Sequence, residues 1–187
     1  MSLVDLIARA DERGLAASGL ACLDRCVPLL GGDDEILRPL WGNLADASDA
    51  ADWGGLVEQV RGKLDTGDGG TGAEDEAVLL ARRMLAAAPA ERTAPHVRDW
   101  ADACSVAALR IHRLLDPAED PSSLDSRRAG RTQDMPPLAA AELRRQVTVL
   151  EVLAGHGAGG LRRALEVSVE GRRVLRAVVS RRARGRG

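Results

Sequence analysis

Two cysteines near the N-terminus are the residues of this chain best spaced to bind a metal ion. Cys22 and Cys26 lie four positions apart, which places both thiols on one face of a helix. A tetrahedral zinc site could be completed by any of Cys104, His96, His112 and His156. Structural zinc sites combine two close ligand pairs, however, and the sequence contains no second pair. Because cysteine is also a common small core residue, we expect core packing and assign no metal ligand.

A glycine-rich segment at residues 65–76 carries two partial motifs. A G-x-G-x-x-G pattern is formed by Gly67, Gly69 and Gly72. In dinucleotide folds this pattern follows a strand, whereas the segment before it here is expected to be a helix. The first, sixth and twelfth positions of a calcium loop are occupied by Asp65, Gly70 and Glu76, but glycines replace the ligands at the third and fifth positions. We therefore interpret the segment as a flexible acidic turn.

No catalytic signature is present in the sequence. Lys63 is followed by Leu64 and not by serine or threonine, so there is no P-loop. The nucleophile-elbow pattern G-x-S-x-G and the zinc-protease pattern H-E-x-x-H are also missing from the sequence. The sequence supports no enzymatic activity, and we name no catalytic residue and no cofactor.

Arginines near the C-terminus are the remaining candidates for binding chemistry. Residues 127–187 carry fourteen arginines and five carboxylates, whereas residues 1–126 carry twelve basic and twenty-three acidic residues. Guanidinium groups bind phosphate through paired hydrogen bonds, so a basic tail is suited to a polyanion such as nucleic acid. The candidate polyanion-binding residues are Arg172, Arg173, Arg181, Arg182, Arg184 and Arg186.

The elements that must position these residues are helices. The chain has no phenylalanine or tyrosine, and its core must be built from leucine, valine and alanine with Trp41, Trp53 and Trp100. Alanine and leucine favour helices, and apolar residues recur at helical spacing along most of the sequence. We expect an all-α protein, a helical-hairpin array or bundle of about six helices followed by a basic two-helix appendage. Residues 161–179 also fit a β-hairpin, but we favour a helix there.

The charge distribution suggests a division of the chain. We expect an acidic all-helical domain over residues 1–116 and a linker or mobile loop, poor in apolar residues, over residues 117–137. A basic helical hairpin should follow over residues 138–180, with a disordered arginine-rich tail over residues 181–187. Whether the basic part docks on the acidic part is left open by the sequence.

A shift of 34 residues aligns the first part of the chain with itself. This shift matches Leu3, Leu6, Ile7, Ala10, Leu23, Cys26 and Leu30 with Leu37, Leu40, Trp41, Leu44, Val57, Val60 and Leu64. Over residues 3–64 the chain thus resembles tetratricopeptide repeats, which are helical hairpins that stack into solenoids. The family's aromatic positions are mostly leucine or alanine here, and a third copy starting near Thr71 fails. The resemblance implies a stacked helical array that holds a protein or peptide ligand.

These observations lead to one expected function and two alternatives. We expect a non-enzymatic helical scaffold or adaptor that binds a protein partner, with Trp41 and Trp53 as anchors wherever they are exposed. The first alternative is a nucleic-acid-associated regulator that uses the C-terminal arginines. The second is a metal-binding protein or enzyme that uses Cys22 and Cys26. Asp5 interrupts the apolar start and no long apolar run follows, so we expect a cytoplasmic protein without membrane contact.

Overall fold

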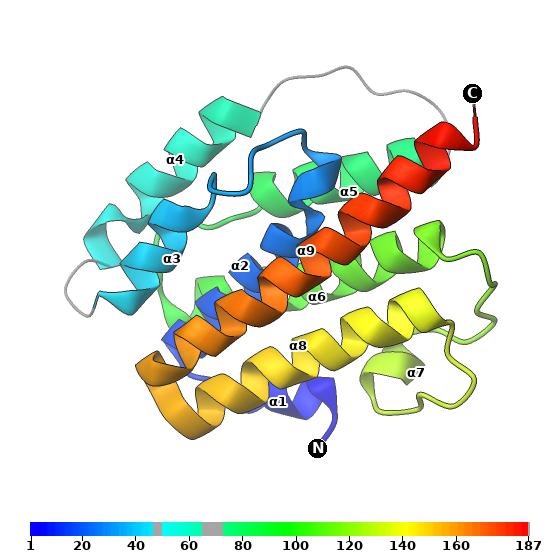
Figure 1. Ribbon diagram of the computed structural model, residues 1–187. Helices are drawn as coiled ribbons and strands as arrows, with labels where there is room; N and C mark the ends of the chain where they lie inside the picture. Colours follow the sequence, from blue (N-terminus) through cyan, green and yellow to red (C-terminus); the bar gives the residue numbers. More distant parts are fainter. Residues whose placement is uncertain (47–49, 65–72, 187) are drawn as a thin grey trace.

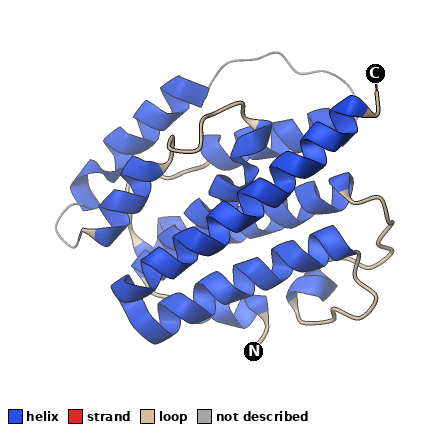
Figure 2. Cartoon of the chain, in the orientation of Figure 1, coloured by secondary structure: helices blue, strands red, loops and turns tan. Residues whose placement is uncertain are grey.

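The computed structural model describes residues 1–46, 50–64 and 73–186, and all regular structure within them is helical (Figures 1 and 2). The expected all-α fold is therefore confirmed. The α-helices are α1 (Leu3–Arg9), α2 (Glu12–Cys26), α3 (Arg38–Ala45), α4 (Trp53–Leu64), α5 (Ala73–Ala86), α6 (Ala94–Leu115), α7 (Leu124–Arg128), α8 (Pro137–His156) and α9 (Leu161–Arg184). Short 3₁₀ turns are η1 (Val27–Leu29), η2 (Ala50–Asp52) and η3 (Gly157–Gly160). None of the described helices is long and apolar enough to span a bilayer.

Helix α2 is the centre of the core. It begins at a cap where the Asp11 carboxylate accepts from the Gly14 amide at 2.7 Å, and it is buried from Gly14 to its end. Its alanine, leucine, cysteine and glycine side chains allow α6, α8 and α9 to pack around it. Gly19 allows the close approach of α6, since a Cβ there would lie 2.7 Å from the Trp100 ring. Trp100 in turn meets Trp53 edge to face, with ring centroids 6.0 Å apart.

Helices α8 and α9 form an antiparallel pair that lies across α2 and α6 (Figure 1). The helical interpretation of residues 161–179 is confirmed, because α9 runs without a break from Leu161 to Arg184. The pair that the sequence suggested as a basic appendage packs directly on the helices of the acidic part. The tail expected to be disordered from residue 181 is helical as far as Arg184, where arginines in the last turn complement the helix dipole.

The segment 117–137, expected to be a linker or mobile loop, contains α7 and buried charged side chains. Arg127 is 4% exposed and forms an ion pair with Asp120 at 2.7 Å. The Arg127 guanidinium also donates to the carbonyls of Arg131 and Gln133, at 2.8 and 2.7 Å. At the start of the segment, the Asp116 carboxylate accepts from the first amides of α8. Polar contacts hold this segment against the bundle. The lack of apolar residues in the sequence gives no sign of these contacts.

Gly171 on α9 is required by the packing of two arginines. A Cβ at this position would lie 2.3 Å from Cδ of Arg25 and 3.0 Å from Cδ of Arg145. Arg25 is fully buried and fixed by an ion pair, so it cannot move aside. We expect Gly171→Ala to lower the free energy of unfolding by about 1–3 kcal/mol, the usual cost of overpacking.

The matched control is Gly62→Ala on α4, where nothing lies within 4 Å of the added Cβ. Alanine is the better helix former, so this variant should gain about 0.5–1 kcal/mol. Urea denaturation of both variants measures the two effects. A Gly171→Ala protein as stable as Gly62→Ala would show that the close approach of α9 to Arg25 is wrong.

Candidate functional site

A buried ion pair lies between α2 and α8. The Arg25 guanidinium donates from Nε and Nη2 to the two oxygens of Glu142, at 2.8 and 2.7 Å, and both side chains are fully buried. Burial alone would raise the pKa of Glu142. The charge of Arg25, helped by His112 and by hydrogen bonds, instead lowers this pKa to about 2. Glu142 is therefore ionised at neutral pH inside the core.

A chain of polar side chains extends from this pair. Gln146 donates to Glu142 at 2.9 Å and accepts from Ser105 at 2.7 Å, and Ser105 in turn accepts from Arg128 at 3.1 Å. These residues come from α6, α7 and α8. These hydrogen bonds hold the three helices together. None of the side chains named here is an exposed nucleophile or acid. We interpret it as structural.

His112 closes the network on α6. One ring nitrogen, Nδ1, lies 2.7 Å from the Ala108 carbonyl, and the other, Nε2, lies 3.5 Å from a Glu142 oxygen. A carbonyl only accepts, so Nδ1 carries the proton in the neutral ring. Burial lowers the pKa of His112, and the charge of Arg25 lowers it further. The attraction of Glu142 raises this pKa, but the effect of burial is larger. His112 is a neutral core residue at neutral pH.

This histidine makes stability depend on pH. Because the pKa of His112 is lower in the folded protein than in the unfolded one, the unfolded protein binds a proton below about pH 6.5 that the folded protein does not bind. The free energy of unfolding therefore falls as the pH falls. We expect the free energy of unfolding of the wild type, relative to His112→Gln, to decrease by up to about 1.4 kcal/mol per pH unit in that range. Urea denaturation of both proteins at several pH values measures this. A wild type that gains stability relative to His112→Gln in acid would mean that the buried ring is charged.

A second group of ion pairs attaches α9 to the N-terminal helices. Asp24 accepts from Arg172 Nη1 at 2.6 Å and from Trp41 Nε1 at 2.8 Å, and its side chain is 2% exposed. One turn further along α9, Arg176 donates to Asp34 at 3.0 Å. The hydrogen bond from Arg176 lowers the pKa of the Asp34 carboxyl. The basic helix therefore docks on the acidic part of the chain, which the sequence had left open.

The six candidate arginines are divided by these contacts. Arg172 is buried against Asp24 and so is not available to a polyanion, whereas Arg186 is exposed and paired with Glu74. Arg173, Arg181 and Arg184 are exposed and Arg182 is half-buried, and none of the four forms a direct ion pair in the part of the chain that the structure describes. The charge of Arg173 acts on Asp34 only from a distance and helps to lower the pKa of that carboxyl.

The two candidate tryptophan anchors are buried. Trp53 is fully buried and donates to the Pro89 carbonyl at 2.9 Å, while Trp41 is 6% exposed and bound to Asp24. A protein-binding anchor must be exposed in the free protein, so neither Trp41 nor Trp53 meets the condition under which an anchor role was suggested. Both indoles stabilise the core.

The three cysteines are also core residues. Cys22, Cys26 and Cys104 are free thiols with at most 1% exposure. Burial raises the pKa of Cys22 to about 12, and it raises the pKa of Cys26 and Cys104 well above the usual range. Among the described residues no three His, Cys, Asp or Glu side chains are grouped so as to hold a metal ion. The G-x-G-x-x-G pattern and most of the calcium-loop pattern lie outside the described residues.

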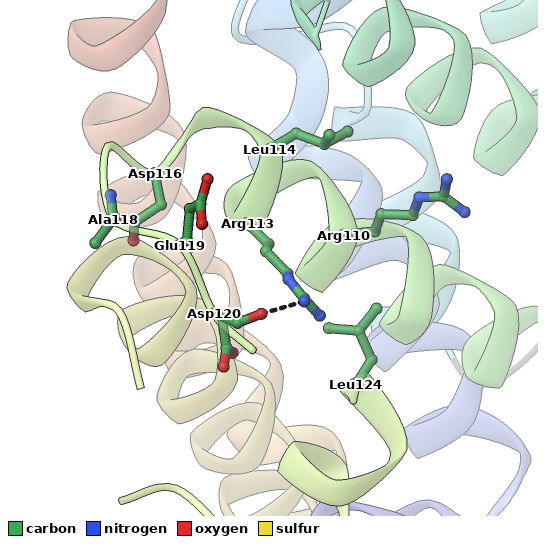
Figure 3. Close-up of a pocket in the computed structure, with 8 residues that line it drawn as sticks. All are labelled: Arg110, Arg113, Leu114, Asp116, Ala118, Glu119, Asp120 and Leu124. Carbon is green, nitrogen blue, oxygen red and sulfur yellow. Dashed lines mark hydrogen bonds between the residues drawn. The ribbon is translucent and has the colours of Figure 1, made fainter. Parts of the chain in front are cut away.

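A polar hollow of about 650 Å³ lies beside the C-terminal end of α6 (Figure 3). Three of its charged side chains make contacts that stabilise the fold. Arg113 donates to the carbonyls of Asp120 and Ser122, Asp120 pairs with Arg127, and Asp116 caps α8. We assign it no ligand of its own. Three of its eight lining residues are apolar: Leu114, Ala118 and Leu124.

An apolar hollow of about 390 Å³ lies between α5 and α6. Its lining is apolar except for two arginines at the margins, and it consists of Leu80, Arg83, Met84, Ala87, Trp100, Ala103, Cys104, Val106, Ala107 and Arg110. Arg110 also lines the polar hollow, so both hollows border this residue of α6. We call the hollow between α5 and α6 the α5–α6 groove.

Sequence reasoning missed this groove because small apolar side chains indicate a core. Ala103 is exposed and Ala107 is half-buried, although alanines in an apolar stripe suggest complete burial. One signal in the sequence could have indicated the groove. Arg110 follows these alanines at helical spacing, and a charged residue on the same side of a helix indicates that this side reaches the surface.

Comparison of the chain with protein-family models, with curated proteins and with solved structures finds no match. The resemblance of residues 3–64 to tetratricopeptide repeats therefore stays a prediction. Any functional conclusion has to come from the surface of this molecule.

Proposed function

We propose that this protein is a non-enzymatic helical adaptor that holds an amphipathic helix of a protein partner in the α5–α6 groove. The observation that carries the proposal is an almost entirely apolar lining that remains open at the surface between two packed helices. Grooves of this kind take up the apolar face of a partner helix, whose anchors recur at helical spacing.

The dimensions of the groove fit a short helix. Along α6, Ala103, Ala107, Arg110 and Leu114 follow one another at helical spacing on the face that lines the two hollows. Eleven residues of helix span about 16 Å, which corresponds to roughly three turns of a partner helix. Ala87, Ala103 and Ala107 are small, so that they let a second backbone approach closely.

Charge at the margins suggests the chemistry of the partner. Arg83 is exposed and has no ionic partner among the described residues, whereas Arg110 is paired with Glu76 at 2.7 Å. Leu79 is 45% exposed on the same helix as Arg83 but does not line the groove. The complementary partner is an amphipathic helix with leucine-like anchors and a carboxylate flanking them.

A designed peptide tests this proposal. The probe is a labelled helical peptide of about four turns, with leucines at i, i+3, i+4 and i+7 and glutamates beside them, compared with a peptide of scrambled order. Fluorescence anisotropy measures its affinity for the full chain. We expect Ala103→Gln, which places an amide in the groove, to weaken binding about tenfold, or about 1.4 kcal/mol. Arg83→Gln should weaken binding of this peptide but not of one in which glutamines replace the glutamates.

The matched control is Ala86→Gln, which changes an exposed alanine on α5 that does not line the groove and should leave affinity unchanged. Equal binding of the scrambled peptide, or equal losses in the two variants, would overturn the proposal. Self-association of the chain that Ala103→Gln abolishes would assign the groove to a second copy of this chain instead.

A further inference from the structure

The C-terminal half of α9 presents arginines that form no ion pair with the residues that the structure describes. Residues 171–187 contain seven arginines and no carboxylate. Three of them, Arg172, Arg176 and Arg186, pair with acidic residues of the N-terminal helices and loops. Of the others, Arg173, Arg181 and Arg184 form what we call the α9 arginine strip. Arg182, nine positions after Arg173, lies on the opposite side of the helix and is half-buried.

The strip is a continuous surface on one face of the helix. Arg173, Arg181 and Arg184 are separated by eight and three positions, with Ala177 between the first two, so that they point in nearly the same direction. They span about 16 Å along the helix axis. The opposite face of α9, with Ala164, Ser168 and Leu175, is buried in the bundle.

The first half of α9 shows a different arrangement. Arg162 and Arg163 are exposed as well, but both pair with Glu166, at 3.5 and 3.2 Å. The helix dipole favours cations in the last turn, which accounts for arginines at 181–184. It does not account for Arg173, because the effect of the dipole falls off within a turn of the helix end.

We propose that the α9 arginine strip binds the phosphate backbone of duplex nucleic acid. Guanidinium groups pair with phosphates through two hydrogen bonds, and unpaired arginines on a rigid helix are already positioned for such contacts. The exposed face carries no aromatic side chain, so stacking on the bases of a single strand is not available. An anionic membrane would select bulky apolar residues between the arginines, whereas Ala177 and Ser180 stand there. The contacts are to the backbone and carry no sequence specificity.

The test uses the full chain and a labelled mixed-sequence DNA duplex of about 20 base pairs, titrated over a series of salt concentrations. We expect the logarithm of the binding constant to fall linearly with the logarithm of salt, with a slope of about −0.9 for each phosphate neutralised. The variant Arg173→Gln/Arg181→Gln/Arg184→Gln should lose most of the affinity at low salt and most of this slope. Circular dichroism confirms that the variant is folded.

The matched control is Arg162→Gln/Arg163→Gln, which removes two exposed arginines of the same helix that are already paired with Glu166. Its DNA affinity should be nearly that of the wild type. No duplex binding at low salt, or equal losses in the two variants, would overturn the proposal. So would tighter binding to single-stranded RNA, or binding only to vesicles of anionic lipid. Each arm is independent of the peptide experiment on the α5–α6 groove.

Discussion

Replacing Glu142 by glutamine is expected to lower the free energy of unfolding by about 3–5 kcal/mol. The change removes the carboxylate that pairs with Arg25 and leaves a fully buried guanidinium without its counter-charge. A neutral amide cannot accept from Nε and Nη2 together as the carboxylate does at 2.8 and 2.7 Å. The loss should appear as a lower urea midpoint without a change in helix content at zero denaturant.

A double variant distinguishes the cost of breaking the pair from the contribution of the pair itself. In Arg25→Met/Glu142→Leu neither charge is left in the core, so the protein should be more stable than Glu142→Gln alone. Glu166→Gln changes an exposed carboxylate on α9 and should leave the midpoint nearly unchanged. If Glu142→Gln matched the stability of Glu166→Gln, water would have to reach Arg25 and the sealed network described above would be wrong.

The sequence predicts the helices of this protein well because local signals define them. Ser2 and Asp5 form the capping box at the start of α1, and Pro39 stands in the first turn of α3. The apolar stripe of α9 is continuous at helical spacing, and this outweighs the short alternation that resembles a strand. Each of these features depends on residues close together in the chain.

The polar core could not be predicted in the same way. Glu142 and Gln146 occupy the side of α8 that continues with Val149 and Leu153, and this is the signal that was available. A charge at the edge of an apolar stripe usually marks the border with solvent. Only a partner of opposite charge makes burial possible, and Arg25 lies 117 positions away in the sequence. Nothing local shows that the two side chains meet.

The candidate binding residues show the same limit. Composition identifies an arginine-rich end, but it gives adjacent arginines the same role. The structure separates them by the direction in which they leave the helix: Arg172 points to the bundle and Arg173 to solvent. Likewise, the sequence does not show whether Trp41 is exposed, whereas in the structure its indole N–H donates to Asp24 inside the fold.

Arg172→Met is expected to destabilise the protein by about 3 kcal/mol, whereas Arg173→Met should leave stability nearly unchanged. The first variant deprives the buried Asp24 carboxylate of its guanidinium partner and leaves it only the indole N–H of Trp41. Urea denaturation of this adjacent pair is the measurement. Equal stability of the two variants would contradict the docking of α9 on α2.

The pH dependence of the Arg172→Met variant shows whether its loss of stability comes from lost charge or from lost packing. Burial already raises the pKa of Asp24 against the effect of Arg172, and loss of the guanidinium should raise it further. A carboxyl with a raised pKa is stabilised by protonation as the pH falls, so the deficit of Arg172→Met relative to wild type should shrink in acid. A deficit that stayed constant would indicate lost packing instead of lost charge.

In the DNA titration the variant with the larger effect should be Arg173→Met, because it removes a contact of the α9 arginine strip and Arg172→Met removes none.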